Sequence, residues 1–208
     1  MTRKLKSLSM ALFAVLAVSA AGASAASATD FTLMAVYSGD QVVSEQHAFV
    51  ADGHETRCKQ ASFSGETQVT SSSTATLSPT YKECTSAGLI AVVEMNGCHY
   101  LLHLGEATTI ATVDLVCPSG KEVTINQSGG ACVIHVPPFT GKSDVKLTNV
   151  AVEGVGKIKG EATVGGIQAI LTDSGEFFCP FTGNTTVENA TYTGNLTVSH
   201  DGFAMHVG

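Results

Sequence analysis

Residues 89–105 read LIAVVEMNGCHYLLHLG, in which Asn96 and Gly97 separate two largely apolar stretches. Asn-Gly between alternating stretches is the strongest short-range signal for a β-hairpin, because a type I′ turn needs positive φ at both central positions. We therefore predict a hairpin here, with Glu94 facing His99 across the turn.

The second stretch also raises the question of a metal site, because Cys98, His99 and His103 lie within six residues. Side chains on a strand alternate between its two faces, so Tyr100 and Leu102 share the face of Cys98. The two histidines lie on the other face, ~13 Å apart, which is too far for both to bind one zinc ion. We expect no metal ligands here or elsewhere in the chain.

The rest of the chain repeats this β pattern. Short segments alternate apolar and polar residues, and Gly, Asn, Asp or Pro separate them. The clearest segments are FTLMAVYS from Phe31, TIATVDLV from Thr109, KEVTINQ from Lys121, DVKLTNVAV from Asp144 and GNLTVSH from Gly194. We predict an all-β fold, either an antiparallel β-sandwich or a barrel-like meander, stapled by disulfides.

The first 28 residues have the order of a secretory signal peptide. Three basic residues precede an apolar stretch at 7–22, and the small residues of GASAASATD follow. An A-x-A site predicts cleavage after Ala25 or Ala28. A membrane anchor is the weaker alternative, because the apolar stretch is short for a span. We expect a secreted, extracellular protein with no integral membrane span in its mature chain.

Residues 29–208 are expected to form a single β-rich domain, with a subdomain boundary near 137–143 as the alternative. Eight of the 11 basic residues and all 18 acidic residues lie in this part, which leaves a formal charge of −10. Because nucleic-acid-binding proteins present clusters of Lys and Arg to the phosphates, we expect no nucleic-acid partner.

All the cysteines follow the predicted signal peptide, and an even number in an exported chain predicts three structural disulfides. They are Cys58, Cys84, Cys98, Cys117, Cys132 and Cys179.

Two pairings are open for the four central cysteines. The similar spacing within segments 84–104 and 117–137 favours Cys84–Cys98 and Cys117–Cys132. Strand geometry slightly favours Cys98–Cys117 and Cys84–Cys132, because a seven-residue strand holds its ends ~20 Å apart and a disulfide needs Cα atoms within ~7 Å. In either case Cys58 is expected to pair with Cys179.

The common signatures of secreted enzymes are not found in the sequence. There is no G-x-S-x-G, and HETRC at His54 lacks the second histidine of a zinc-protease motif. Asp173-Ser174-Gly175 matches a serine-protease nucleophile in three letters alone and is typical of a hairpin turn. We therefore predict no catalytic residues and no cofactor.

Five segments between Ser78 and Ser199 read SPTYKECTSAGLIAVVEMNGCHY, VDLVCPSGKEVTI, CVIHVPP, VKLTNVAVEG and ATYTGNLTVS. They resemble a loose group of exported, cysteine-containing, uncharacterised proteins of Gram-positive bacteria. The resemblance implies an exported β-rich module, and it supplies no catalytic or binding residue.

These observations together favour a non-enzymatic exported β-sandwich domain. Its role would be structural, adhesive or ligand-binding, at the cell surface or outside the cell, with a protein or glycan as a possible partner. A small secreted hydrolase of wall or matrix polymers and an inhibitor-like binder are the alternatives.

Overall fold

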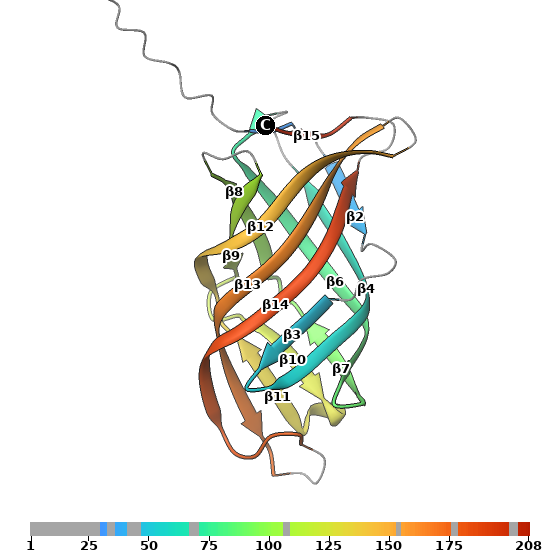
Figure 1. The fold of residues 1–208 in the computed structure, drawn as a ribbon. Helices are drawn as coiled ribbons and strands as arrows, with labels where there is room; N and C mark the ends of the chain where they lie inside the picture. Colours follow the sequence, from blue (N-terminus) through green and yellow to red (C-terminus); the bar gives the residue numbers. More distant parts are fainter. Residues whose placement is uncertain are drawn as a thin grey trace, which may run out of the picture.

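The chain forms β-strands along most of its length (Figure 1). The computed structural model describes residues 30–32, 36–40, 47–66, 71–105, 109–152, 155–175, 179–199 and 204–208, and the predicted signal peptide lies outside these ranges. The strands pair antiparallel throughout the described ranges, which confirms the predicted all-β antiparallel fold.

The elements in chain order are β1 (Phe31–Thr32), β2 (Val36–Asp40), β3 (His47–Ala51), β4 (His54–Glu66), β5 (Ser71–Ser72), β6 (Thr74–Ser86), β7 (Leu89–Glu94), β8 (His99–Leu104), β9 (Ile110–Val116), β10 (Val123–Gln127), the 3-10 helix η1 (Ser128–Gly130), β11 (Cys132–Val136), β12 (Phe139–Val152), β13 (Val155–Asp173), β14 (Thr185–Ser199) and β15 (His206–Val207). Strands from both sides of Pro137-Pro138 belong to one sheet. None of the described residues form a helix with the length and apolar character needed to cross a membrane.

The main sheet is an up-and-down meander with eight strand positions in the described ranges. Four positions are single long strands, β4, β6, β13 and β14. The other four are two strands in line: β2 with β3, β7 with β8, β9 with β10, and β11 with β12. Each position pairs with the next along the chain, and β14 pairs back with β2 and β3. The sheet therefore closes, so of the two predicted architectures the barrel-like meander is the one observed.

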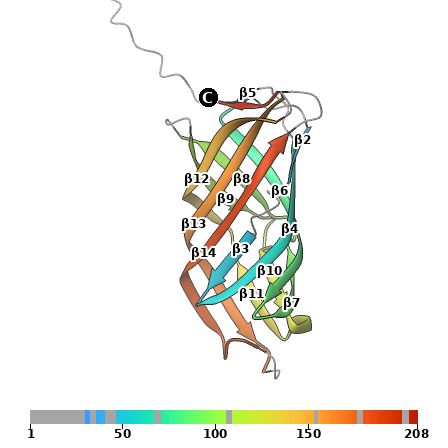
Figure 2. The same cartoon turned by 45° about the vertical axis from the view of Figure 1, so that its right-hand side comes forward.

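The long strands cross the barrel wall obliquely in both views (Figures 1 and 2). Tilt allows a sheet to close, and eight strands leave an interior just wide enough for packed side chains or one small ligand. Burial alternates along the wall, as in β10, where Val123, Ile125 and Gln127 are buried and the residues between them are half-buried. A segment with this alternating pattern is stable as a strand of the barrel because its apolar side chains all face the interior.

The Asn96-Gly97 turn forms, but it does not make the predicted hairpin. Both residues have positive φ, 52° and 83°, and the Cys98 N–H donates to the Met95 carbonyl oxygen at 2.8 Å. The chain then continues in its original direction, so β7 and β8 both run antiparallel to β6.

The predicted pairing of Glu94 with His99 is therefore wrong. Glu94 pairs with Thr124 of β10, and His99 pairs with Val116 of β9. The physical reason lies in β6, whose 13 residues offer a long row of backbone donors and acceptors. By continuing past the turn, the chain pairs with both ends of β6, whereas a hairpin would leave part of that row unpaired.

Three disulfides join all six cysteines: Cys58–Cys84, Cys98–Cys117 and Cys132–Cys179. The pair Cys98–Cys117 agrees with the crossed alternative. This disulfide links two neighbouring strand positions where each of them is interrupted. The predicted pairs Cys58–Cys179 and Cys84–Cys132 are wrong, and so are the pairs within segments 84–104 and 117–137.

The cause of this error is a strand register that the cysteine spacing does not reveal. Cys58 of β4 lies directly opposite Cys84 of β6, with Cα atoms 3.9 Å apart. Cys179 lies in the connection between β13 and β14, which brings its Cα within 5.4 Å of that of Cys132.

A small sheet, β15–β1–β5, lies at the upper end of the barrel in Figure 1. Phe31 and Val207 of this sheet are buried, and so is Met205, which precedes β15. The Asn149 side chain on β12 fastens β15, because it donates to the Val207 carbonyl oxygen and accepts from the Val207 N–H, both at 2.8 Å.

Candidate functional site

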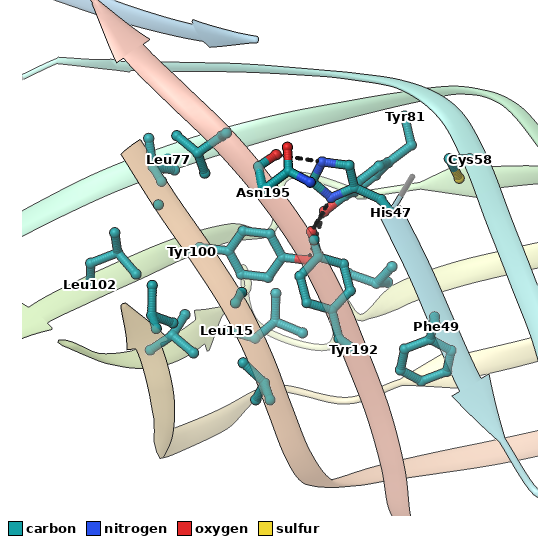
Figure 3. A pocket seen from close by; sticks show the side chains of 18 of the residues that line it. His47, Phe49, Cys58, Leu77, Tyr81, Tyr100, Leu102, Leu115, Tyr192 and Asn195 are labelled. Atoms are coloured by element: carbon teal, nitrogen blue, oxygen red, sulfur yellow. Dashed lines mark hydrogen bonds between the residues drawn. The ribbon is translucent and has the colours of Figure 1, made fainter. Parts of the chain in front are cut away.

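The interior of the barrel contains a cavity of about 120 Å³. Side chains from β1 and from every strand position of the wall line it, and most of them are apolar. Leu77, Leu102 and Leu115 are among these apolar side chains (Figure 3). No Asp, Glu, Lys or Arg among the described residues lines the cavity, so its surface carries no full charge when its histidine is neutral.

All four tyrosines of the chain line this cavity. Three of them, with one histidine, form a continuous set of hydrogen bonds that we call the tyrosine relay: His47, Tyr192, Tyr81 and Tyr100 (Figure 3). His47 Nδ1 lies 2.5 Å from the Tyr192 hydroxyl. The Tyr81 hydroxyl lies 3.0 Å from that of Tyr192 and 3.1 Å from that of Tyr100. The relay is the main polar feature of an otherwise apolar interior.

The strands position the relay through their alternation and register. His47 is the first residue of β3 and faces inward, 2% exposed. Its Nε2 lies 2.8 Å from the backbone oxygen of Asn195 on the neighbouring β14. A Cβ at Gly194 would overlap the His47 ring and approach the Tyr192 hydroxyl, so the relay needs a glycine at this position.

Burial determines the charge state of the relay. Loss of hydration lowers the pKa of His47 to about 4, and the hydrogen bond to Asn195 opposes this change only in part. Burial raises the pKa of Tyr81 and Tyr192 well above the ordinary value for tyrosine, and raises that of Tyr100 in the same direction. All four side chains are therefore neutral at pH 7.

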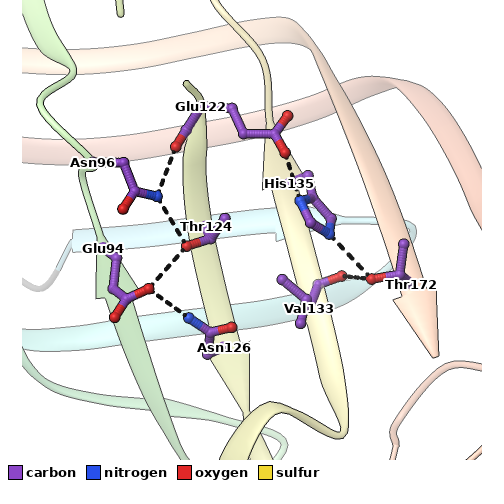
Figure 4. Close-up of polar contacts among 8 residues, drawn as sticks. All are labelled: Glu94, Asn96, Glu122, Thr124, Asn126, Val133, His135 and Thr172. Atoms are coloured by element: carbon purple, nitrogen blue, oxygen red, sulfur yellow. Dashed lines mark hydrogen bonds and ion pairs between the residues drawn. The ribbon is translucent and has the colours of Figure 1, made fainter. Parts of the chain in front are cut away.

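A second polar cluster lies on the outer face of the barrel, across β7, β10, β11 and β13 (Figure 4). Glu122 Oε1 lies 2.7 Å from His135 Nδ1, and His135 Nε2 lies 3.2 Å from Thr172 Oγ1. The order of carboxylate, imidazole and hydroxyl is that of a hydrolase triad.

The surroundings of this outer cluster do not support catalysis. The Thr172 hydroxyl also donates to the Val133 carbonyl oxygen at 3.2 Å. Thr172 and Val133 are paired in the sheet, where backbone N–H groups serve the ladder and not an oxyanion. The members of this cluster do not line the cavity inside the barrel.

The histidines of the opening stretch do not meet in a site. His103 Nε2 lies 3.0 Å from Asp114 Oδ2, and His99 pairs with Val116 in the ladder. Tyr100 and Leu102 line the cavity, which confirms the predicted faces of this strand. Within the described ranges, no three His, Cys, Asp or Glu side chains gather closely enough to hold a metal ion.

The residues that match parts of enzyme motifs in the sequence, His54, Asp173 and Ser174, make structural contacts. His54 packs edge-on against Phe181, with ring centroids 5.6 Å apart. The Asp173 carboxylate accepts a hydrogen bond from the Gly175 N–H at 2.8 Å, and the Ser174 hydroxyl donates to the Ala131 carbonyl oxygen at 2.9 Å.

Sequence reasoning did not identify the relay. Its tyrosines occupy ordinary strand positions, and the chain separations of 19 and 111 residues between the bonded pairs hide their proximity. A usable signal was available in the composition, since the chain has four tyrosines and no tryptophan, and buried tyrosine hydroxyls need partners.

Comparison with known proteins finds no matching family model, no similar curated protein and no similar solved structure. The resemblance to exported proteins of Gram-positive bacteria stays a prediction.

Proposed function

We propose that this chain is an exported, non-enzymatic protein that binds a small apolar molecule inside its barrel. The observation that carries the proposal is the cavity of about 120 Å³ inside the barrel, which is lined mostly by apolar side chains. For comparison, an apolar cavity of about 150 Å³ is large enough to bind benzene. A ring-sized molecule therefore matches the space.

The cost of an empty interior favours binding over a purely structural or adhesive role. A cavity lowers stability by about 24 cal/mol per Å³, so this one costs about 3 kcal/mol. Larger side chains could fill the space; Ala75 and Ala162 both line it. A protein that keeps this cavity despite its cost in stability fits an interior that holds a bound molecule.

Two further observations support export and the absence of catalysis. All six cysteines are joined in disulfides, which persist in oxidising compartments outside the cytosol. The triad-like order of Glu122, His135 and Thr172 lies on the outer face of the sheet, where Thr172 pairs with Val133 in the strand ladder. We expect p-nitrophenyl acetate to be hydrolysed at the same rate by the protein and by its Thr172→Val variant.

Binding can be tested with 4-fluorotoluene, followed by ¹⁹F NMR in the presence of the full mature chain. Ala162→Leu would place three more carbons in the cavity, whereas Thr163→Leu on the same strand places a leucine side chain on the exposed outer face. We expect the parent and Thr163→Leu to bind alike and Ala162→Leu to bind at least about tenfold more weakly. Equal binding by all three proteins, or no binding by any, would overturn the proposal.

A further inference from the structure

The positions of the protons in the tyrosine relay follow from its geometry. His47 Nε2 lies 2.8 Å from the Asn195 carbonyl oxygen, which can only accept, so Nε2 carries the ring proton. In a neutral imidazole Nδ1 is then an acceptor, and the Tyr192 hydroxyl at 2.5 Å must donate to it. The lowered pKa of His47 keeps the ring in this neutral form at pH 7.

Each remaining proton is then assigned in turn, because a phenol has a single proton to donate. Tyr192 donates to His47, so Tyr81 must donate to Tyr192 across 3.0 Å. Tyr100 must in turn donate to Tyr81 across 3.1 Å. Every proton of the relay is used, and the oxygen of Tyr100, at the free end, keeps lone pairs that can accept.

From this order we infer that the cavity selects a neutral, ring-sized apolar molecule with one hydrogen-bond donor, such as a phenol or a cyclic alcohol. The Tyr100 oxygen accepts the hydrogen bond from that donor. The inference rests on the proposed function and specifies its ligand class.

The chemistry of the lining argues against other ligands. A carboxylate needs several donors, and the relay has none left; the described lining offers no Lys or Arg, and the unpartnered Thr56 hydroxyl supplies a single donor. A cationic amine would lose its hydration without a carboxylate to face, since no Asp or Glu of the described ranges lines the cavity. A ring without a hydrogen-bond donor would bind by its apolar surface alone and would make no hydrogen bond to the Tyr100 oxygen.

The test compares 4-fluorophenol, 4-fluorotoluene and 4-fluorobenzoate by ¹⁹F NMR at pH 7, using the full mature chain and its Tyr100→Phe variant. This substitution removes one oxygen and keeps the ring, and thermal unfolding checks that the variant folds. We expect it to weaken 4-fluorophenol binding by about three- to tenfold, the range of one neutral hydrogen bond. Binding of 4-fluorotoluene should stay within twofold, and 4-fluorobenzoate should not bind the parent.

A second variant tests the direction of the relay. Tyr81→Phe breaks the relay between Tyr100 and Tyr192, so the Tyr100 proton becomes free to be donated. An acceptor-only probe, 4-fluoroanisole, should then bind Tyr81→Phe more tightly than the parent, measured relative to 4-fluorotoluene in each protein. Unchanged or weaker relative binding would contradict the assigned direction.

The outcomes separate this inference from the function on which it rests. If 4-fluorotoluene binding is lost in Ala162→Leu but Tyr100→Phe affects the phenol and toluene probes equally, cavity binding stands and the donor assignment is wrong. Binding of 4-fluorobenzoate as tight as that of 4-fluorophenol would also overturn the assignment. If no probe binds, both proposals fail.

Discussion

His47 shows how a single polar residue is kept inside an apolar barrel. Its ring contacts Phe63 from β4, Tyr81 from β6 and Tyr192 from β14, with centroids 5.5–5.8 Å away. Apart from His47, the lining of the cavity within the described ranges contains no His, Asp or Glu, and the three tyrosines of the relay have raised pKa values. His47 therefore has a clear pH signature.

The stability of the protein should fall as the pH decreases from about 6.5 to about 4. The folded pKa of His47 is lowered to about 4 from 6.5, so over this range the unfolded chain binds a proton that the folded chain excludes. The loss from this residue is about 3 kcal/mol in total. Urea unfolding at pH 7, 5.5 and 4 measures it, with His47→Gln as the control that cannot titrate. Identical pH profiles for the two proteins would show that His47 is not held neutral.

Gly194 should be the most sensitive glycine of the barrel wall near the relay. Gly194→Ala forces the new methyl against His47 and Tyr192, and overpacking of this kind costs about 1–3 kcal/mol. The control is Gly165→Ala, because a Cβ at Gly165 on β13 meets no heavy atom within 4 Å. The difference between the two variants in free energy of unfolding tests the packing, and an equal effect of both would contradict it.

Four of the eight strand positions of this barrel are interrupted along their length. β7 passes to β8 through residues 95–98, and β9 passes to β10 through residues 117–122. The two interruptions lie beside each other, because Cys98–Cys117 joins them and Asn96 Nδ2 donates to the Glu122 carbonyl oxygen at 2.9 Å. The disulfide and this hydrogen bond hold the wall together where the strand ladder is broken.

The double variant Cys98→Ser/Cys117→Ser should lower the free energy of unfolding by about 2–4 kcal/mol. The bond spans 19 residues, and its loss frees the unfolded chain from that loop. Guanidinium or urea unfolding measures the change, with exposed Ser119→Ala in the same connection as the control. A double variant as stable as the control would mean that the interruption is held by other contacts.

The strands could be predicted where the local alternation of apolar and polar residues is clear. Alternation identified β7, β9, β10, much of β12 and the last six residues of β14, because a strand with one buried face repeats every second residue. The Asn96-Gly97 turn also formed as its residues require. Its outcome as an interruption was not predictable, because that depends on the length of β6, which lies elsewhere in the chain.

At the scale of the whole molecule, closure of the sheet creates both the cavity and the relay. Tyr81 and Tyr192 come from strands far apart in sequence, and they meet because β14 pairs back with β2 and β3, which pair with β4. A sequence pattern identifies which face of each strand is buried, but not which strands face each other across a barrel. The fold class could therefore be predicted, and the candidate site could not.

The most direct test of an enclosed, apolar and accessible interior is a crystal structure of the mature protein pressurised with xenon. Xenon enters apolar cavities and reports their position by its electron density. We predict a xenon atom inside the barrel, beside Leu102, Leu115 and Tyr100. A crystal structure in which these side chains close on one another, with no xenon between them, would contradict the account.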